Sequence, residues 1–192
     1  SQACCSGGVP LGGSLGLGTA ENKSVQFLMT YDRNILKDLM NFDQVLDDDT
    51  RTRLTNSWLM EVNYGLSDRF AVTAVIPYIE QVRIINGFEG TKETTRTNGL
   101  GDLVILLKYR MVNPEKVEAM DWVLGAGPKL PTGRTDYTNS TGLVLPADMQ
   151  PGTGSLDAFF WSYYKKNNLF IRPLSLVNVI TFRKSGKNTS YN

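Results

Sequence analysis

The side chains in this sequence that could do chemistry are single charged groups placed along otherwise apolar segments. The 192 residues carry 20 Lys and Arg against 19 Asp and Glu, and they include no His. Without imidazole the chain lacks the usual general base and the commonest metal ligand, and a Ser–His catalytic site is excluded. No other nucleophile–base constellation stands out. We therefore expect neither an enzyme nor a bound metal or cofactor.

Two clusters of reactive residues carry weaker signals. The aspartates at 47–49 could attract a divalent cation, but no EF-hand spacing follows, which favours a solvated loop. Cys4 and Cys5 are adjacent, and a disulfide between sequence neighbours is strained. Lipidation or pairing with a partner is one interpretation of these cysteines. The composition of residues 1–23 favours another, a flexible Gly-rich N-terminal segment.

The remaining charges fall on one side of segments that alternate with a period of two. In Leu103–Met111, Ile105 and Leu107 share a side, whereas Lys108 and Arg110 lie on the other. A period of two indicates a strand, and about nine residues is the length that a tilted strand needs to cross a bilayer. We expect six charged residues to face the interior of a barrel and to line or brace its lumen: Glu61, Asp102, Lys108, Arg110, Lys129 and Arg172. For each of them, an internal ion pair that holds the barrel together is the competing interpretation.

The apolar side of the same segments is expected to face lipid. Its members are Trp58, Val62, Val72, Ile76, Ile105, Leu107 and Leu124. No uncharged apolar run approaches the roughly 18 residues of a membrane helix, but a barrel needs apolar residues only at alternate positions. A soluble lipid-binding barrel would show the opposite polarity, with apolar residues inward.

Strand-like patterns occur in seven segments, and the fold class follows from them. They are Ser24–Arg33, Leu54–Tyr64, Arg69–Arg83, Leu103–Met111, Asp121–Leu130, Thr153–Tyr164 and Leu169–Arg183. Pro77 predicts a bulge or bend in the third segment, and Ile35–Leu46 could form a short helix. We predict an all-β, antiparallel up-and-down transmembrane β-barrel of the bacterial outer-membrane type, formed by residues 24–192.

The connections between these segments alternate between long and short. The long ones are Asn34–Arg53, Ile84–Asn98 and Pro131–Gly152; the short ones are Gly65–Arg69, Val112–Met120 and Lys165–Asn168. Outer-membrane barrels show the same alternation of loop lengths, with short periplasmic turns and long outer loops. We therefore expect the long connections to lie outside the cell and the short ones to face the periplasm.

Five short motifs occur in a fixed order along the middle of the chain. They are G-L-S-D-R-F (65–70), I-P-Y (76–78), G-L-G-D-L with L-K-Y-R (99–110), K-L-P-T-G (129–133) and G-T-G-S-L-D (152–157). Over roughly Leu54–Tyr164, this ordered set resembles the outer-membrane transporter family named for the meta-pathway of phenol degradation. The resemblance implies an outer-membrane barrel that passes small, hydrophobic or aromatic compounds.

The pattern departs from that of a closed barrel, and it leaves a second function open. Bacterial barrels usually have an even number of strands, so about seven strands and no terminal aromatic strand predict further strands beyond Asn192. The expected partners are outer-membrane lipids and an unidentified small permeant; no basic run suggests nucleic acid. The alternative is a non-transporting subunit or anchor of a cell-envelope complex, which would contact its partner through the long loops or the N-terminal segment.

Overall fold

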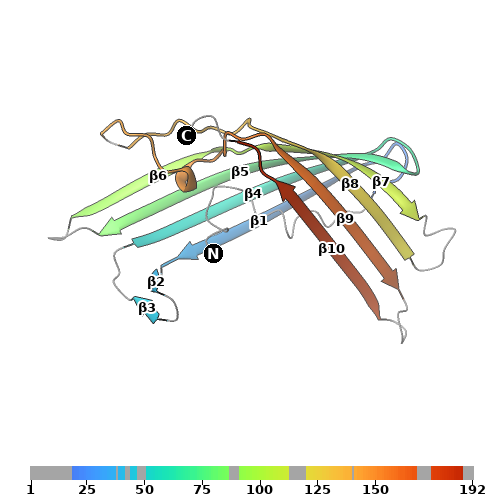
Figure 1. Ribbon diagram of the computed structural model, residues 1–192, viewed down its shortest axis with the longest axis horizontal. Helices are drawn as coiled ribbons and strands as arrows, with labels where there is room; N and C mark the ends of the chain where they lie inside the picture. Colours follow the sequence, from blue (N-terminus) through green and yellow to red (C-terminus); the bar gives the residue numbers. More distant parts are fainter. Residues whose placement is uncertain are drawn as a thin grey trace.

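The computed structural model describes an all-β chain. The described residues are 19–37, 39–41, 44–46, 51–86, 91–112, 120–139, 141–167 and 174–187. Strands are antiparallel throughout, which confirms the predicted all-β class, and the main sheet curls into a half-barrel (Figure 1). Within the described residues, no helix is long and apolar enough to span a bilayer.

The main sheet contains eight strands in up-and-down order. They are β1 (Val25–Leu36), β4 (Arg51–Gly65), β5 (Phe70–Asn86), β6 (Lys92–Leu100), β7 (Leu103–Val112), β8 (Met120–Leu130), β9 (Asp157–Asn167) and β10 (Ser175–Lys184). The order across the sheet is β1-β4-β5-β7-β8-β9-β10, with β6 also paired to β5. A separate small hairpin joins β2 (Leu39–Asn41) to β3 (Gln44–Leu46).

The longest strand, β5, has one continuous neighbour and one interrupted neighbour. Its register with β4 runs unbroken from Ile85 to Ala71, so the bulge predicted at Pro77 is wrong for β5 itself. On the opposite edge, Phe70–Val75 pair with β7 and Tyr78–Asn86 pair with β6. The irregularity therefore lies in the neighbouring strand, which breaks between β6 and β7.

The break follows from the missing N–H of Pro77. In an antiparallel strand the N–H and C=O of one residue point to the same neighbour. The carbonyl oxygen of Pro77 accepts a hydrogen bond from Gly101 N at 2.9 Å, so its absent donor would also have faced this edge. Pro77 can therefore accept a hydrogen bond from the neighbouring strand but cannot donate one to it. The neighbouring strand is interrupted at this point, at Gly101 and Asp102 between β6 and β7.

Three expected connections are corrected by the structure. The segment Ile84–Asn98 is not a loop, because β5 continues to Asn86 and β6 returns beside it; the Thr-rich sequence of β6 suits an exposed strand. The described residues of Ile35–Leu46 contain strands where the sequence predicts a helix, since β1 continues to Leu36 and β2 pairs with β3. The turn expected at Lys165–Asn168 is also wrong, because β9 continues to Asn167 and pairs with β10 there.

The two faces of the sheet differ in burial, residue by residue. In β5 the odd-numbered residues from Ala71 to Gln81 are buried, and the even-numbered ones are half-buried or exposed. We call the buried side the inner face and the other the outer face. The largest apolar cluster of the inner face comprises Leu59, Val75, Val104, Leu106, Val123, Phe159, Trp161 and Tyr163.

The connections gather at two ends of the sheet. The antiparallel order places the turns after β4, β7 and β9 at one end, the turn end, and the connections after β1, β5 and β8 at the other, the loop end. The connection after β8, residues 131–156, contains the 3₁₀ helix η2 (Ala147–Met149) and one isolated β-bridge from Thr138 to Val144. We call residues 131–156 the strap.

Candidate functional site

A network of charged and hydroxyl side chains lies where the strap leaves and rejoins the sheet. Lys129, at the end of β8, places its Nζ 2.7 Å from Asp102 Oδ2 and 3.1 Å from Asp157 Oδ2. Arg183 of β10 places its Nε 3.3 Å from the same Asp157 oxygen. Lys129, Asp102 and Asp157 are all buried. The network thus links the ends of β8, β9 and β10 to the break before β7.

Hydroxyl and backbone donors complete this network. Thr153 donates to Asp102 Oδ2 from both Oγ1 (2.6 Å) and N (2.9 Å). Gly133 N donates to Asp102 Oδ1 at 3.0 Å. Ser155 Oγ and the amide of Gly186 donate to Asp157 Oδ1, each at 2.9 Å. We call Asp102, Lys129, Thr153, Ser155, Asp157 and Arg183 the knot.

Two glycines bring the strap's two ends into backbone contact at the knot. A Cβ on Gly133 would lie 2.5 Å from Gly152 Cα, and one on Gly152 would lie 2.4 Å from the carbonyl carbon of Gly133. No side chain fits at Gly133 or Gly152 without displacing the backbone of the other residue. The motifs 99–103, 129–133 and 152–157 therefore meet in space, although they are far apart in sequence.

A second charged pair lies deeper on the inner face. Lys108 and Glu61 are 0 % and 1 % exposed, and Lys108 Nζ lies 3.5 Å from Glu61 Oε1. The same ammonium lies 4.5 Å from the ring centroid of Trp161, within the range of a cation–π contact. Glu61 Oε2 has no hydrogen-bond partner among the described residues. The pair is therefore packed into the inner face and does not line open space.

Arg110 occupies the turn end of the inner face. Its Nε lies 3.5 Å from Asp121 Oδ1 of β8, and its Nη2 donates to the carbonyl oxygen of Thr19 at 3.2 Å. Thr19 and Ala20 are buried, so the chain just before β1 packs against this end.

The structure places the expected interior charges as three groups and not as one ring. Asp102 and Lys129 belong to the knot, Glu61 and Lys108 to the central pair, and Arg110 to the turn end. Every one of these five side chains has an ionic partner. Arg172, the aspartates at 47–49 and the two cysteines lie outside the described residues.

Four members of the knot are not among the site residues that the sequence predicts. Thr153, Ser155, Asp157 and Arg183 sit at or beyond strand ends, where no alternation assigns a face. The motif at 152–157 contains the first three, but it contributes to the sequence-based prediction only as part of a family resemblance. Its polar residues at alternate positions, Thr153, Ser155 and Asp157, were the available signal.

The residues expected to face lipid all lie on the outer face. Leu107 and Leu124 are exposed, and Trp58, Val62, Val72, Ile76 and Ile105 are half-buried between their neighbours. Phe27 and Met29 of β1 are 72 % and 71 % exposed on the same face. These residues give the outer face an apolar region, which Asn56 and Glu80 border toward the loop end.

Two aromatic groups lie on the outer face along β5, one on each side of its residues 72–76, whereas Phe27 of β1 and Phe160 of β9 lie level with this stretch. At the middle of their strands, Tyr31, Trp58 and Tyr78 lie in register across β1, β4 and β5, with ring centroids 5.3 and 5.8 Å apart. Near the turn end, Phe70 and Tyr109 pack at 4.9 Å. Phe70 and Tyr78 are eight positions apart on β5, which is about 26 Å along a strand that rises about 3.3 Å per residue.

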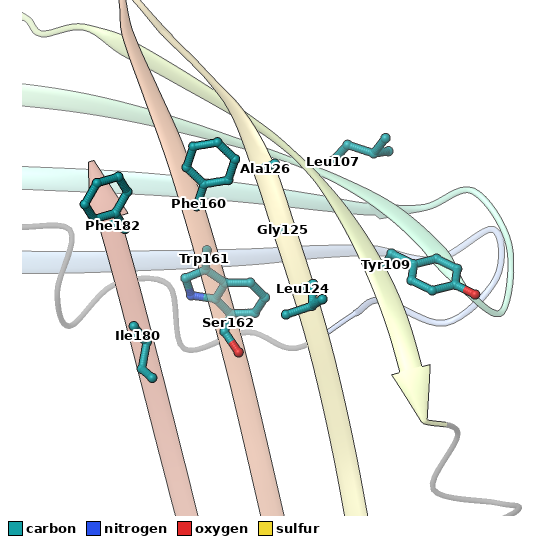
Figure 2. A pocket seen from close by; sticks show the side chains of 10 residues that line it. All are labelled: Leu107, Tyr109, Leu124, Gly125, Ala126, Phe160, Trp161, Ser162, Ile180 and Phe182. Carbon is teal, nitrogen blue, oxygen red and sulfur yellow. The ribbon is translucent and has the colours of Figure 1, made fainter. Parts of the chain in front are cut away.

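A shallow apolar pocket of about 480 Å³ opens on the outer face of β7–β10. Figure 2 shows larger side chains of β7, β9 and β10 around Gly125 and Ala126 of β8. Ala126 lies in register between Leu107 and Phe160, so the hollow arises because a small residue sits between two large ones. Its lining is almost wholly apolar, which suits a hydrocarbon chain.

No model of a known protein family matches the sequence, and a search of curated proteins found no significant match.

Proposed function

We propose that the protein is a membrane-spanning β-barrel of the bacterial outer-membrane type that passes small compounds. The observation that carries this proposal is the pattern of the outer face along β5: an aliphatic stretch with an aromatic group on each side. In outer-membrane barrels such aromatic girdles mark the two interfaces of an apolar band about 25 Å tall. A strand path of about 26 Å, tilted by about 40°, spans about 20 Å along the membrane normal, close to that height.

The charges of the inner face support the same proposal. Buried ionised groups are found with partners, and the alternative of exposing them to hydrocarbon is costly. Here Lys108, Lys129, Glu61 and Asp102 lie on the face opposite the apolar band. The order of the five motifs along the chain resembles the outer-membrane transporter family named above, which favours small hydrophobic or aromatic compounds as the permeants.

A second function is supported by the packing of the inner face. Leu106, Lys108 and Val123 are fully buried, so side chains fill much of the space that a wide channel would leave to water. A non-transporting barrel that anchors or assembles with other cell-envelope proteins would have such an interior. Transport requires that part of this interior open.

Reconstitution distinguishes the two functions. The purified protein, folded in detergent, is incorporated into planar bilayers and into liposomes loaded with small uncharged solutes. We expect discrete conductance steps and solute efflux. Folded, inserted protein without conductance or efflux would favour the anchor function. Protein that remains soluble and monodisperse in buffer without detergent would contradict the membrane location itself.

A further inference from the structure

The strap crosses the inner face of the sheet from β8 to β4. The Tyr137 hydroxyl donates to the carbonyl oxygen of Asn98 on β6. A Cβ on Gly101 would lie 2.9 Å from Pro77 Cγ of β5 and 3.1 Å from Pro151 O, so Pro151 packs beside β5. Arg53 Nη1 of β4 lies 3.0 Å from Asp148 Oδ2. Figure 1 shows η2 and its flanking chain lying along the loop end of β5 and β6.

The strap contains a set of internal hydrogen bonds. The fully buried Gln150 accepts from Tyr137 N at 3.1 Å and donates to the carbonyl oxygens of Tyr137 and Leu145 at 3.0 and 3.1 Å. Met149 beside it is also fully buried. Because these bonds close the strap on itself, it can move as one body without losing them.

The two attachments of the strap differ in strength. At the knot, buried carboxylates are held by several donors each, including backbone amides. At the far side, the Arg53–Asp148 pair is partly open to solvent, with side chains 14 % and 36 % exposed. Ion pairs that are open to solvent contribute little to stability, whereas breaking a buried pair is strongly destabilising. The strap is therefore hinged at the knot and only lightly held at β4.

Two buried polar atoms on the loop-end half of the inner face have no hydrogen-bond partner among the described residues. Gln81 of β5 and Thr97 of β6 lie opposite one another in register and are 4 % and 3 % exposed. Gln81 Oε1 and Thr97 Oγ1 make no hydrogen bond to any described residue. Buried polar atoms in this state are destabilising, and access of water or a polar solute would satisfy them.

We propose that the strap is a gate, hinged at the knot and latched by Arg53 and Asp148, and that opening the latch uncovers Gln81 and Thr97. This inference rests on the proposed transport function, because it names the element that limits passage. When the latch opens, the Tyr137–Asn98 hydrogen bond to β6 also breaks, and the strap lifts from β4, β5 and β6 while Lys129, Asp102 and Asp157 stay joined. Small solutes then enter over a polar surface.

Two independent readouts test the gate. In protein with Cys4→Ser and Cys5→Ser, Thr97→Cys reports exposure beneath the strap through its rate of modification by a water-soluble maleimide. Efflux of small uncharged solutes from liposomes reports passage. The latch variant is Arg53→Gln, and the matched control is Arg69→Gln, an exposed arginine at the turn end. The swap Arg53→Asp with Asp148→Arg restores the pair with its charges exchanged.

We expect Arg53→Gln to raise both the labelling rate of Thr97→Cys and the efflux rate several-fold. Arg69→Gln should leave both unchanged, and the charge swap should return both toward the starting values. Unchanged labelling in Arg53→Gln would overturn the gate. Where the unsubstituted protein passes solute, faster labelling in Arg53→Gln without faster efflux would show that the strap moves but does not control passage. No efflux from any inserted variant would overturn the transport function on which the gate depends.

Discussion

Two ionic groups on the same inner face, the knot and the Glu61–Lys108 pair, are built in different ways. In the knot, Asp102 and Asp157 each accept from a backbone amide as well as from side chains. In the pair, the contact between Lys108 and Glu61 is 3.5 Å long, and Glu61 Oε2 accepts nothing from the described residues. The knot joins chain segments; the pair neutralises charge within an already formed sheet.

This difference indicates which of the charged groups can be replaced by apolar residues without loss of stability. A buried ion pair exchanged as a whole for apolar residues of similar size is often neutral or stabilising, because desolvation offsets its attraction. A network that also satisfies backbone amides has no such apolar equivalent, because its backbone donors would remain buried and unpaired. We therefore expect the pair to tolerate joint replacement and the knot not to tolerate it.

The largest expected effect is at the centre of the knot. Asp157→Leu should lower the free energy of unfolding by about 3–5 kcal/mol, because it leaves Lys129 and Arg183 without this carboxylate and Gly186 N without its acceptor. Urea unfolding in detergent micelles measures the change. Asp68→Asn, at an exposed turn aspartate, is the control. A loss below about 1 kcal/mol would remove the distinction between knot and pair.

The central pair gives the complementary test. Lys108→Met alone should lower the free energy of unfolding by about 3 kcal/mol, because Glu61 is left buried without its cation. The double variant Glu61→Met with Lys108→Met should lie within about 1 kcal/mol of the original protein. In a background with Trp58→Phe and Trp122→Phe, the fluorescence of Trp161 follows the unfolding from within the site. If the double variant is as unstable as the single one, the pair is not replaceable as a unit.

A charge introduced on the outer face tests whether this face contacts lipid, in contrast to the inner face, which holds paired charges. Ile105→Lys should lower the free energy of unfolding in lipid bilayers by about 2–4 kcal/mol if residue 105 lies at the membrane midplane. Ile105→Leu is the control for packing. A lysine at 105 that is as well tolerated as Lys108 would argue against lipid contact.

Backbone contact within the knot is tested at its closest approach. Gly133→Ala should cost about 1–3 kcal/mol, because the added methyl group overlaps the backbone at Gly152. Gly142→Asn is the matched control, since Gly142 has open space around it and its φ of +81° is one that asparagine tolerates. Equal unfolding midpoints for the two variants would show that the strap ends are not in tight contact.

The smallest expected effect is at an exposed ion pair within the strap. The hydrogen bond from Arg134 holds the pKa of the Asp136 carboxyl below its usual value. Stability from this pair is therefore present above the ordinary pKa and is lost as the pH falls through the lowered one. Because both groups are exposed, Asp136→Asn should leave the urea midpoint unchanged at pH 7 and at pH 3. A clear shift at pH 7 alone would show that this pair also anchors the strap.

Strand positions and their alternation were largely predictable because both depend on neighbours in sequence. Leu103–Met111 alternates in sequence and in burial, and β7 occupies almost the same residues. β6 was missed because the sheet leaves most of Lys92–Leu100 exposed, so no apolar alternation marks it. The helix expected within Ile35–Leu46 failed because pairing with β4 extends β1 to Leu36.

By itself, the sequence determined the all-β class, the placement of most strands and the separation of charged from apolar sides, since a period of two is a property of adjacent residues. Only the tertiary structure decided which charges meet. Asp102, Lys129, Asp157 and Arg183 come from four separate segments, and strand order and register bring them together. The path of the strap to Arg53 was likewise decided by packing, because an ion pair 95 residues apart in sequence leaves no local pattern.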